Sequence, residues 1–353
     1  MTEKNFNEDN EPIPVSVITG FLGSGKTTLL NHLLGHPGMG DTAVLINEFG
    51  EIGVDHLLVR KLDEDVVLLN SGCLCCTVRD DLVISLRDML HKRVKGDLPP
   101  FKRVVIETTG LADPAPILHT LMTDLVLSSR YRVDGIVTTV DAVNGAHQLD
   151  IYMESVKQLA VADRIVLTKM DIADSATIEA LCTRLSNINP AAPVIPADHG
   201  AVEPAYLFDA GLYDPETKSP AVSRWLREEA YAEQEAHDHQ QHSDVNRHDD
   251  HIRAFCMTVD LPIPWAPFVD WIESLIVTQG DNILRIKGVL NIIGEDVPVA
   301  VHGVQHIFHP PTRLTAWPDD ERWSRLVFIT RDISKKAIED SFAAMVGTAV
   351  EWA

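Results

Sequence analysis

Short apolar segments alternate with amphipathic ones through the first half of the chain. Residues 13–19 (IPVSVIT) are rich in β-branched residues and end at Gly20, and the helically spaced segment LLNHLL follows them. An amphipathic segment at 78–93 is also typical of a helix. Further segments typical of strands lie at 42–47, 65–70, 102–108, 134–141, 164–169 and 192–197. The alternation predicts a doubly wound, mostly parallel α/β sheet in a domain that spans residues 13–215.

The pattern changes after this region. Residues 216–251 are predicted to form an acidic, His-rich linker, because the stretch contains almost nothing that could enter a core. Apolar segments resume at 253–261, and helical segments at 264–280 and 334–347 flank further strands. This arrangement predicts a smaller C-terminal α+β domain over residues 252–353. The polar residues 1–12 are expected to form a disordered tail.

Five histidines fall within the linker, and two interpretations of them stay open. They are His237, His239, His242, His248 and His251. Such a cluster is compatible with a weak, multi-site metal tether and equally with a solvated polar linker.

The charge balance excludes some classes of partner. The 353 residues include 30 Lys and Arg against 52 Asp and Glu, which gives a formal net charge of −22. A surface this acidic repels phosphate backbones and anionic lipids, so we expect neither nucleic-acid nor membrane-surface binding. No apolar segment approaches the roughly 18 residues of a membrane-spanning helix, and the N-terminus lacks the layout of a signal peptide. We therefore expect a cytoplasmic protein.

The strongest motif lies where the first strand ends. Residues 20–27 fit G-x-x-x-x-G-K-[ST], with the strand before and the helix after that this phosphate-binding loop requires. Backbone N–H groups of such a loop cradle phosphate, helped by the positive end of the helix dipole. Lys26 is expected at the β- and γ-phosphates, and the Thr27 hydroxyl at Mg²⁺. The expected phosphate-binding residues are Gly20, Phe21, Leu22, Gly23, Ser24, Gly25, Lys26 and Thr27.

Polar residues after a later strand predict which base is bound. The segment 164–169 ends with Thr168 and Lys169, and Asp171 follows it. These residues are expected at the edge of the sheet where ligands bind. The Asp171 carboxylate would accept hydrogen bonds from N1–H and N2–H₂ of guanine, which adenine cannot supply, and Lys169 would lie along the ring face. His199, in the loop after the next strand, is placed to close over the base. These residues predict GTP as the substrate.

Two further residues are candidates for the hydrolytic reaction. Glu107 ends the apolar segment 102–108 and would order the hydration shell of Mg²⁺, and the N–H of Gly110 would meet the γ-phosphate. No Gln or Arg is identified as a water-positioning residue. We therefore expect slow basal hydrolysis.

Three of the five cysteines lie together. Cys73, Cys75 and Cys76 precede a helix that Thr77 and Asp80 are expected to cap, and a helix N-terminus lowers thiol pKa values. Thiolates in this spacing can supply two or three sulfurs to a tetrahedral ion, most simply Zn²⁺, although Cu(I) also suits them.

The thiolate cluster offers fewer than the four ligands of a closed structural site. Glu48, Glu51, a histidine or water would complete it, which favours an open or exchangeable metal site. The isolated Cys182 and Cys256 are interpreted as packing residues.

Taken together, the motifs identify a family. TGFLGSGKTTLLNHLL, NEFGEIGVD, NSGCLCC, ETTGLADP, VDAV and TKMD occur in the order found in the CobW-like P-loop GTPases, and the resemblance extends over nearly the whole chain. It implies a P-loop GTPase sheet, a CobW-like C-terminal domain, and GTP hydrolysis coupled to the binding and delivery of a transition metal, usually zinc. Position by position, it implies phosphate binding by Gly20 to Thr28, guanine binding by Lys169 and Asp171, and metal binding by the three clustered cysteines.

The resemblance also places two acidic residues and shows two departures. Glu48 and Glu51 match acidic positions near the metal and the nucleotide. Many relatives carry Asn where this chain has Thr168. Some members carry a Glu, which could bind metal, immediately before NEFGE, where this chain has Ile46.

Two functions from different classes fit these features. The first is a GTP-hydrolysing metallochaperone that delivers its metal to a client metalloprotein. The second is a metal-responsive, GTP-binding regulatory switch in which hydrolysis is incidental. A P-loop kinase is disfavoured by the TKMD segment and by the absence of a recognisable lid. In either case the C-terminal domain is expected to bind the client or to mediate self-association.

Overall fold

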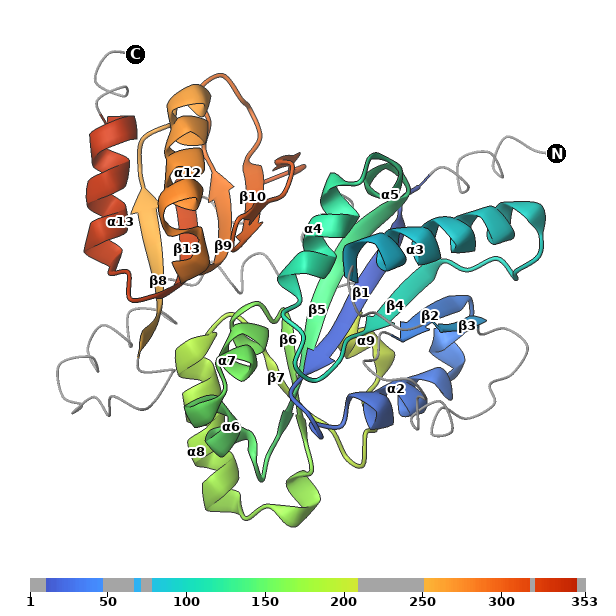
Figure 1. The fold of residues 1–353 in the computed structure, drawn as a ribbon. Helices are drawn as coiled ribbons and strands as arrows, with labels where there is room; N and C mark the ends of the chain where they lie inside the picture. Colours follow the sequence, from blue (N-terminus) through green and yellow to red (C-terminus); the bar gives the residue numbers. More distant parts are fainter. Residues whose placement is uncertain (1–10, 47–66, 71–77, 209–250, 318–320, 348–353) are drawn as a thin grey trace. The chain divides into compact units, whose positions relative to one another are not determined.

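The computed structural model describes residues 11–46, 67–70, 78–208, 251–317 and 321–347, which form two compact units (Figure 1). The first unit contains the described residues before His147, together with Ala162–Glu179 and the described residues from Val194 to 208. The second contains His147–Val161, Ala180–Pro193 and the described residues from 251 onward.

The first unit is built on a seven-stranded sheet. Its strands follow the order β3-β2-β4-β1-β5-β6-β7, and each neighbouring pair runs parallel. The strands are β1 (Ile13–Gly20), β2 (Thr42–Ile46), β3 (Val67–Asn70), β4 (Arg103–Glu107), β5 (Tyr131–Asp141), β6 (Arg164–Thr168) and β7 (Val194–Pro196). The structure confirms the predicted parallel α/β sheet.

Helices cover both faces of this sheet. On one face, α2 (Lys26–Leu34) and α9 (Pro204–Leu207) bury leucines against side chains of β1, β2, β4, β5 and β6. The opposite face is covered by α3 (Val78–Lys95), α4 (Ala115–Thr123) and α5 (Leu125–Arg130) (Figure 1). The other helices before residue 208 are η1 (Pro37–Met39), α6 (Gly145–Ile151), α7 (Met153–Ala160), η3 (Met170–Ile172) and α8 (Ser175–Ile188), of which α7 lies wholly within the second unit. Within the described residues, none of the helices is sufficiently long and apolar to cross a membrane.

The second unit contains an antiparallel sheet and confirms the predicted α+β character of the C-terminal region. Its strand order is β11-β10-β9-β13-β8, with β12 also paired to β10. The strands are β8 (Ile252–Val259), β9 (Ile283–Leu290), β10 (Val299–Val304), β11 (Ile307–Phe308), β12 (Thr312–Arg313) and β13 (Ser324–Arg331). The helices are α12 (Trp265–Gln279), η5 (Gly280–Asn282), α13 (Lys335–Phe342) and the π-helical turn η6 (Ala343–Gly347).

Aromatic side chains from helices and strands form the core of the second unit. The Trp271 ring on α12 meets the Phe342 ring edge-on at 5.0 Å, and Phe255 and Phe328 stack at 5.5 Å across β8 and β13. The predicted final helix at 334–347 is not one regular helix. It begins with Ser334 as the N-cap and changes to π-helical bonding after Phe342, within the packed aromatic cluster.

Candidate nucleotide-binding site

The phosphate loop connects β1 to α2 through a turn that only glycine permits. Gly20 has φ +142°, and a Cβ there would lie 2.2 Å from Thr139 Oγ1 and 2.4 Å from the Thr139 carbonyl oxygen. Gly25, the N-cap of α2, is left-handed with φ +93° and has no side chain to cap the helix. The first-turn N–H groups of α2 therefore lie at the carboxyl edge of the sheet, where an anion can accept from them.

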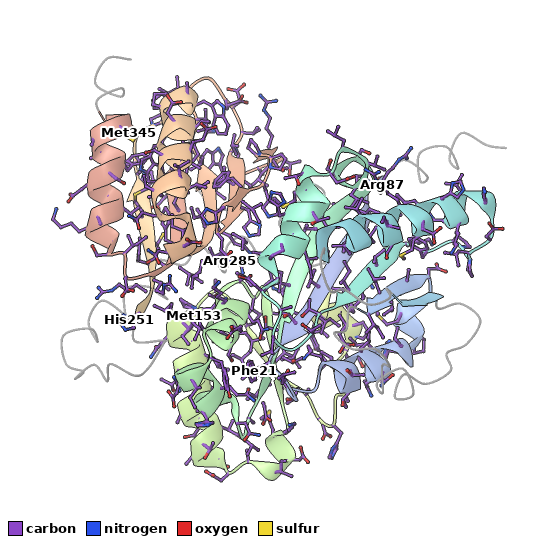
Figure 2. All side chains as sticks on the ribbon, viewed as in Figure 1. Phe21, Arg87, Met153, His251, Arg285 and Met345 are labelled. Atoms are coloured by element: carbon purple, nitrogen blue, oxygen red, sulfur yellow. The ribbon has the colours of Figure 1, made fainter. Side chains whose placement is uncertain are left out.

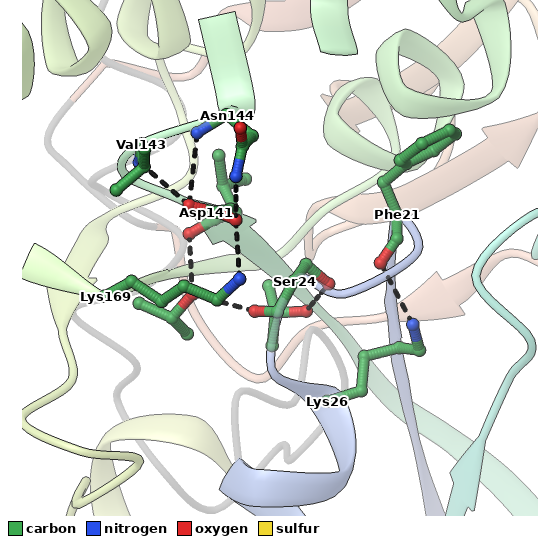
Figure 3. Close-up of polar contacts among 10 residues, drawn as sticks. Phe21, Ser24, Lys26, Asp141, Val143, Asn144 and Lys169 are labelled. Atoms are coloured by element: carbon green, nitrogen blue, oxygen red, sulfur yellow. Dashed lines mark hydrogen bonds and ion pairs between the residues drawn. The ribbon is translucent and has the colours of Figure 1, made fainter.

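The Lys26 side chain folds back over the loop. It is 8% exposed, and its Nζ donates to the carbonyl oxygens of Gly20 at 2.9 Å and Phe21 at 3.1 Å (Figure 3). An ammonium held among carbonyl groups with little water binds an anionic oxygen strongly, because hydrogen bonds between charged groups are stronger than those between neutral ones. The loop thus presents a cation where the sequence predicts the β- and γ-phosphates.

Thr27 and Glu107 are brought together although 80 residues separate them in the sequence. Thr27 Oγ1 donates to Glu107 Oε1 at 2.7 Å, and Glu107 is 4% exposed at the end of β4. A hydroxyl and a carboxylate are the hard oxygen ligands that Mg²⁺ prefers. The pair therefore suits Mg²⁺, the ion that the sequence predicts near each of these two residues.

Gly110 places the segment after β4 against the phosphate loop. A Cβ at residue 110 would lie 2.6 Å from the backbone N of Leu22 and 2.7 Å from its Cα. No larger residue fits this approach, so the backbone after Glu107 is in contact with the loop. The structure thus brings Gly110 beside the predicted phosphate site.

The carboxyl end of β6 carries the predicted base-binding residues. Thr168 is buried, and its hydroxyl lies 2.8 Å from the Ser24 carbonyl oxygen and 3.1 Å from that of Val140. Lys169 has φ +57°, and this left-handed residue turns the chain into η3, which contains Asp171. The Asp171 side chain is 38% exposed and therefore accessible to a ligand.

The loop after β7 brings His199 beside Asp171. Gly200 approaches α2 so closely that a Cβ would lie 3.1 Å from the Thr28 carbonyl oxygen, which anchors the loop. His199 Nδ1 is 3.8 Å from Asp171 Oδ2, and the His199 side chain is 76% exposed. The imidazole thus lies next to the predicted guanine acceptor.

One residue of the site, Asp141, was not singled out from the sequence. It lies at the end of β5, its side chain is 1% exposed, and it accepts a hydrogen bond from Lys169 Nζ at 2.7 Å. It also accepts from the Val143 N–H at 2.8 Å, and from the Asn144 N–H and Nδ2 at 3.1 and 2.9 Å (Figure 3). Burial raises the pKa of Asp141, but these hydrogen bonds lower it more, so its pKa lies below the ordinary 3.8. The VDAV segment contained the signal, an aspartate at a strand end.

The predicted transition-metal ligands lie outside the described residues. They are Cys73, Cys75, Cys76, Glu48 and Glu51. Thr77, predicted to cap the following helix, and the linker histidines up to His248 lie outside them as well. In the part of the chain that the structure describes, no three His, Cys, Asp or Glu side chains gather as a metal site would require.

The two isolated cysteines occupy packed positions. Cys256 is buried on β8 in the second unit. Partial burial raises the pKa of the Cys182 thiol on α8, which disfavours the thiolate form that binds metals.

Comparisons with known proteins agree with this geometry. Residues 14–196 match the CobW/HypB/UreG nucleotide-binding domain, and residues 252–346 match the cobalamin synthesis protein CobW C-terminal domain.

The chain is 35% identical over 334 residues to the zinc chaperone YjiA of Escherichia coli (strain K12), covering 95% of this chain and 99% of the relative. It is 34% identical over 220 residues to zinc-regulated GTPase metalloprotein activator 1 of Schizosaccharomyces pombe, covering 59% of this chain and 52% of the relative. The crystal structure of Zn(II)-bound YjiA GTPase from E. coli is similar in fold, with a TM-score of 0.70, 32% identity and coverage of 95% and 99% of the two chains.

Proposed function

Because the chain belongs to the CobW/HypB/UreG family of nucleotide-binding proteins, we propose that this GTPase binds zinc and delivers it to a client metalloprotein. The observation that supports the proposal most is the position of Cys73, Cys75 and Cys76. They lie in the segment that joins β3 to α3, within a chain that resembles a zinc chaperone along its length. Similarity to the zinc-regulated GTPase metalloprotein activator 1 of Schizosaccharomyces pombe supports a metalloprotein as the client.

Each residue of the phosphate site has a role in binding the phosphates or Mg²⁺. The loop from Gly20 to Thr28 holds the phosphates through its N–H groups, and Lys26 donates to the β- and γ-phosphate oxygens. Thr27 would hold Mg²⁺ and Glu107 would order the hydration shell of the ion, which would neutralise charge on the phosphates. The N–H of Gly110 donates to the γ-phosphate.

The base site distinguishes guanine from adenine through Asp171. Its exposed carboxylate accepts from N1–H and N2–H₂ of guanine, while Lys169 covers the ring and His199 closes beside it. Adenine offers no such pair of donors, so binding ATP leaves the carboxylate without hydrogen-bond partners.

Asp171→Asn is therefore expected to reduce the preference for GTP over ATP. An amide also donates where the carboxylate accepts, so the variant should gain affinity for xanthosine triphosphate, whose 2-oxo group accepts. Competition of each nucleotide against a fluorescent GTP analogue measures both changes. Equal competition by ATP and GTP against the unaltered protein would exclude the guanine assignment.

Zinc binding is assigned to the cysteines because of their spacing and their place in the chain. Three thiolates supply a tetrahedral ion with most of its ligands, and Glu48 or Glu51 completes an exchangeable site. A site with one weak ligand suits a protein that must release its ion to an acceptor.

Contacts on one face of the sheet support coupling between the metal and the nucleotide. Arg87, labelled in Figure 2, lies on α3, the helix that follows the cysteines. Its guanidinium donates to both carboxylate oxygens of Asp124, at 3.1 and 2.8 Å. Asp124 ends α4 and caps α5 by accepting from the N–H groups of Val126 and Leu127, each at 3.0 Å. Since α4 follows the Glu107–Gly110 segment, a change at the γ-phosphate can be transmitted to α3 through this contact.

A metal-responsive switch is the second candidate, and one experiment separates it from the chaperone. The protein is loaded with zinc and GTP, and single-turnover hydrolysis is followed together with zinc transfer to an apo acceptor chelator. A chaperone is expected to release zinc with the rate constant of hydrolysis. Hydrolysis without release would favour the switch, with the second unit contacting the regulated partner or a second copy of the chain.

A further inference from the structure

Asp141 is a buried anion whose hydrogen-bond donors come from two separate parts of the chain. Three of them belong to Val143 and Asn144, which immediately follow β5, and the fourth is the Lys169 ammonium at the end of β6. The parallel register that pairs Asp141 with Thr168 places these strand ends side by side. The carboxylate is thus held by the turn that follows it as well as by Lys169 (Figure 3).

Lys169 occupies a backbone conformation that lysine disfavours. Its φ of +57° and ψ of +29° lie in the left-handed region, where a Cβ is crowded by the following carbonyl. A residue other than glycine persists there only when its surroundings stabilise it. The ion pair with Asp141 supplies that stabilisation, because it joins an ammonium to a carboxylate that is 1% exposed.

The left-handed turn determines where Asp171 lies. Thr168, before the turn, is fixed by its contacts with the phosphate loop and β5, whereas Asp171 follows two residues after Lys169 on the exposed η3 turn. A change of φ at Lys169 would therefore rotate Asp171 away while leaving Thr168 in place.

We propose that Asp141 is a positioning residue for base recognition, which holds Lys169 in its left-handed turn and thereby places Asp171 to accept from guanine. The inference rests on the proposed guanine site. Asp141 does not contact the base in this account, and its effect on selectivity passes through the backbone of Lys169.

Asp141→Asn tests the proposal, because its amide cannot form the ion pair. We expect the preference for GTP over ATP to fall by about tenfold or more, because a hydrogen bond between charged groups stabilises a conformation more than one between neutral groups does. Asn144→Ala removes one donor to Asp141 but keeps the ion pair, so it should cause a smaller loss in the same direction. Asp88→Asn is the matched control, since it breaks the exposed pair of Asp88 with Lys92 (2.7 Å) on α3 and should leave the preference unchanged.

Glycine at position 169 separates positioning from simple stabilisation. Glycine adopts the left-handed conformation without strain, so Lys169→Gly needs no ion pair to keep the turn. The double variant Asp141→Asn/Lys169→Gly is therefore expected to show the same preference for GTP over ATP as Lys169→Gly alone, since both variants lack the Lys169 contact with the ring. Binding of GTP and ATP is measured by competition, with the melting temperature recorded for every variant.

The outcomes distinguish this inference from the guanine assignment. If Asp171→Asn loses selectivity while a folded Asp141→Asn keeps it, the positioning role is wrong and the guanine site stands. A double variant that is less selective for GTP than Lys169→Gly alone would also overturn the inference. If the unaltered protein does not prefer GTP, the proposed base site itself fails.

Discussion

Lys26→Ala is expected to abolish tight binding of GTP. The structure shows the Lys26 ammonium already inside the phosphate loop, held by two of its carbonyl groups and 8% exposed. Bound GTP would exchange these neutral acceptors for phosphate oxygens. Two hydrogen bonds to charged groups contribute about 3 kcal/mol or more together, so we expect the affinity to fall at least about 100-fold.

Titration with a fluorescent GTP analogue measures this loss, and a surface lysine provides the control. Lys102 pairs with Asp41 at 3.4 Å and its side chain is 83% exposed, so Lys102→Ala should bind GTP as the unaltered protein does. A Lys26→Ala variant with normal GTP affinity would mean that the phosphates bind elsewhere.

Replacement of Cys73, Cys75 and Cys76 by serine is expected to remove zinc binding while leaving GTP binding nearly intact. Serine hydroxyls stay protonated near neutral pH and do not replace thiolates as zinc ligands. In the part of the chain that the structure describes, the Lys26 ammonium is held by carbonyl groups of the phosphate loop itself. Cys182→Ser is the matched control because this half-buried cysteine lies alone on α8, and it should retain zinc affinity. Zinc bound as tightly by the triple variant would exclude the thiolate site.

Much of the nucleotide site could be predicted because the residues that bind the phosphates lie close together in the sequence. The phosphate loop needs a strand, two glycines, a lysine and a hydroxyl in one short segment, and these residues are consecutive. From its place at a strand end, Glu107 was predicted to order the hydration shell of Mg²⁺, and its carboxylate lies 2.7 Å from the hydroxyl of Thr27, the predicted Mg²⁺ ligand. Their contact follows because β1 and β4 are neighbours in the sheet.

Other features depend on the order of the strands, which local patterns do not specify. Asp141 meets Lys169 only because β5 lies beside β6 with Asp141 opposite Thr168. The left-handed conformation of Lys169 has no signal in the segment TKMD, since lysine rarely adopts it.

Strand boundaries were also displaced by distant contacts. β5 begins at Tyr131, three residues before the predicted start at 134, because its residues 131–133 pair with residues 13–15 of β1. The buried Tyr131 hydroxyl also donates to the Leu86 carbonyl oxygen on α3 at 3.0 Å. Such a bond between elements 45 residues apart leaves no trace in the alternation of apolar and polar positions.

Coupling between nucleotide and metal is the central claim, and zinc affinity in two nucleotide states tests it most directly. Zn²⁺ is titrated against a chromophoric chelator with the protein bound to GDP, and again with a non-hydrolysable GTP analogue. A coupling free energy of about 1–3 kcal/mol would change zinc affinity roughly 5–150-fold between the states, and linkage requires zinc to change nucleotide affinity by the same factor. The account predicts such a difference, and predicts its loss in the triple serine variant. Identical zinc affinities in the two nucleotide states would contradict it.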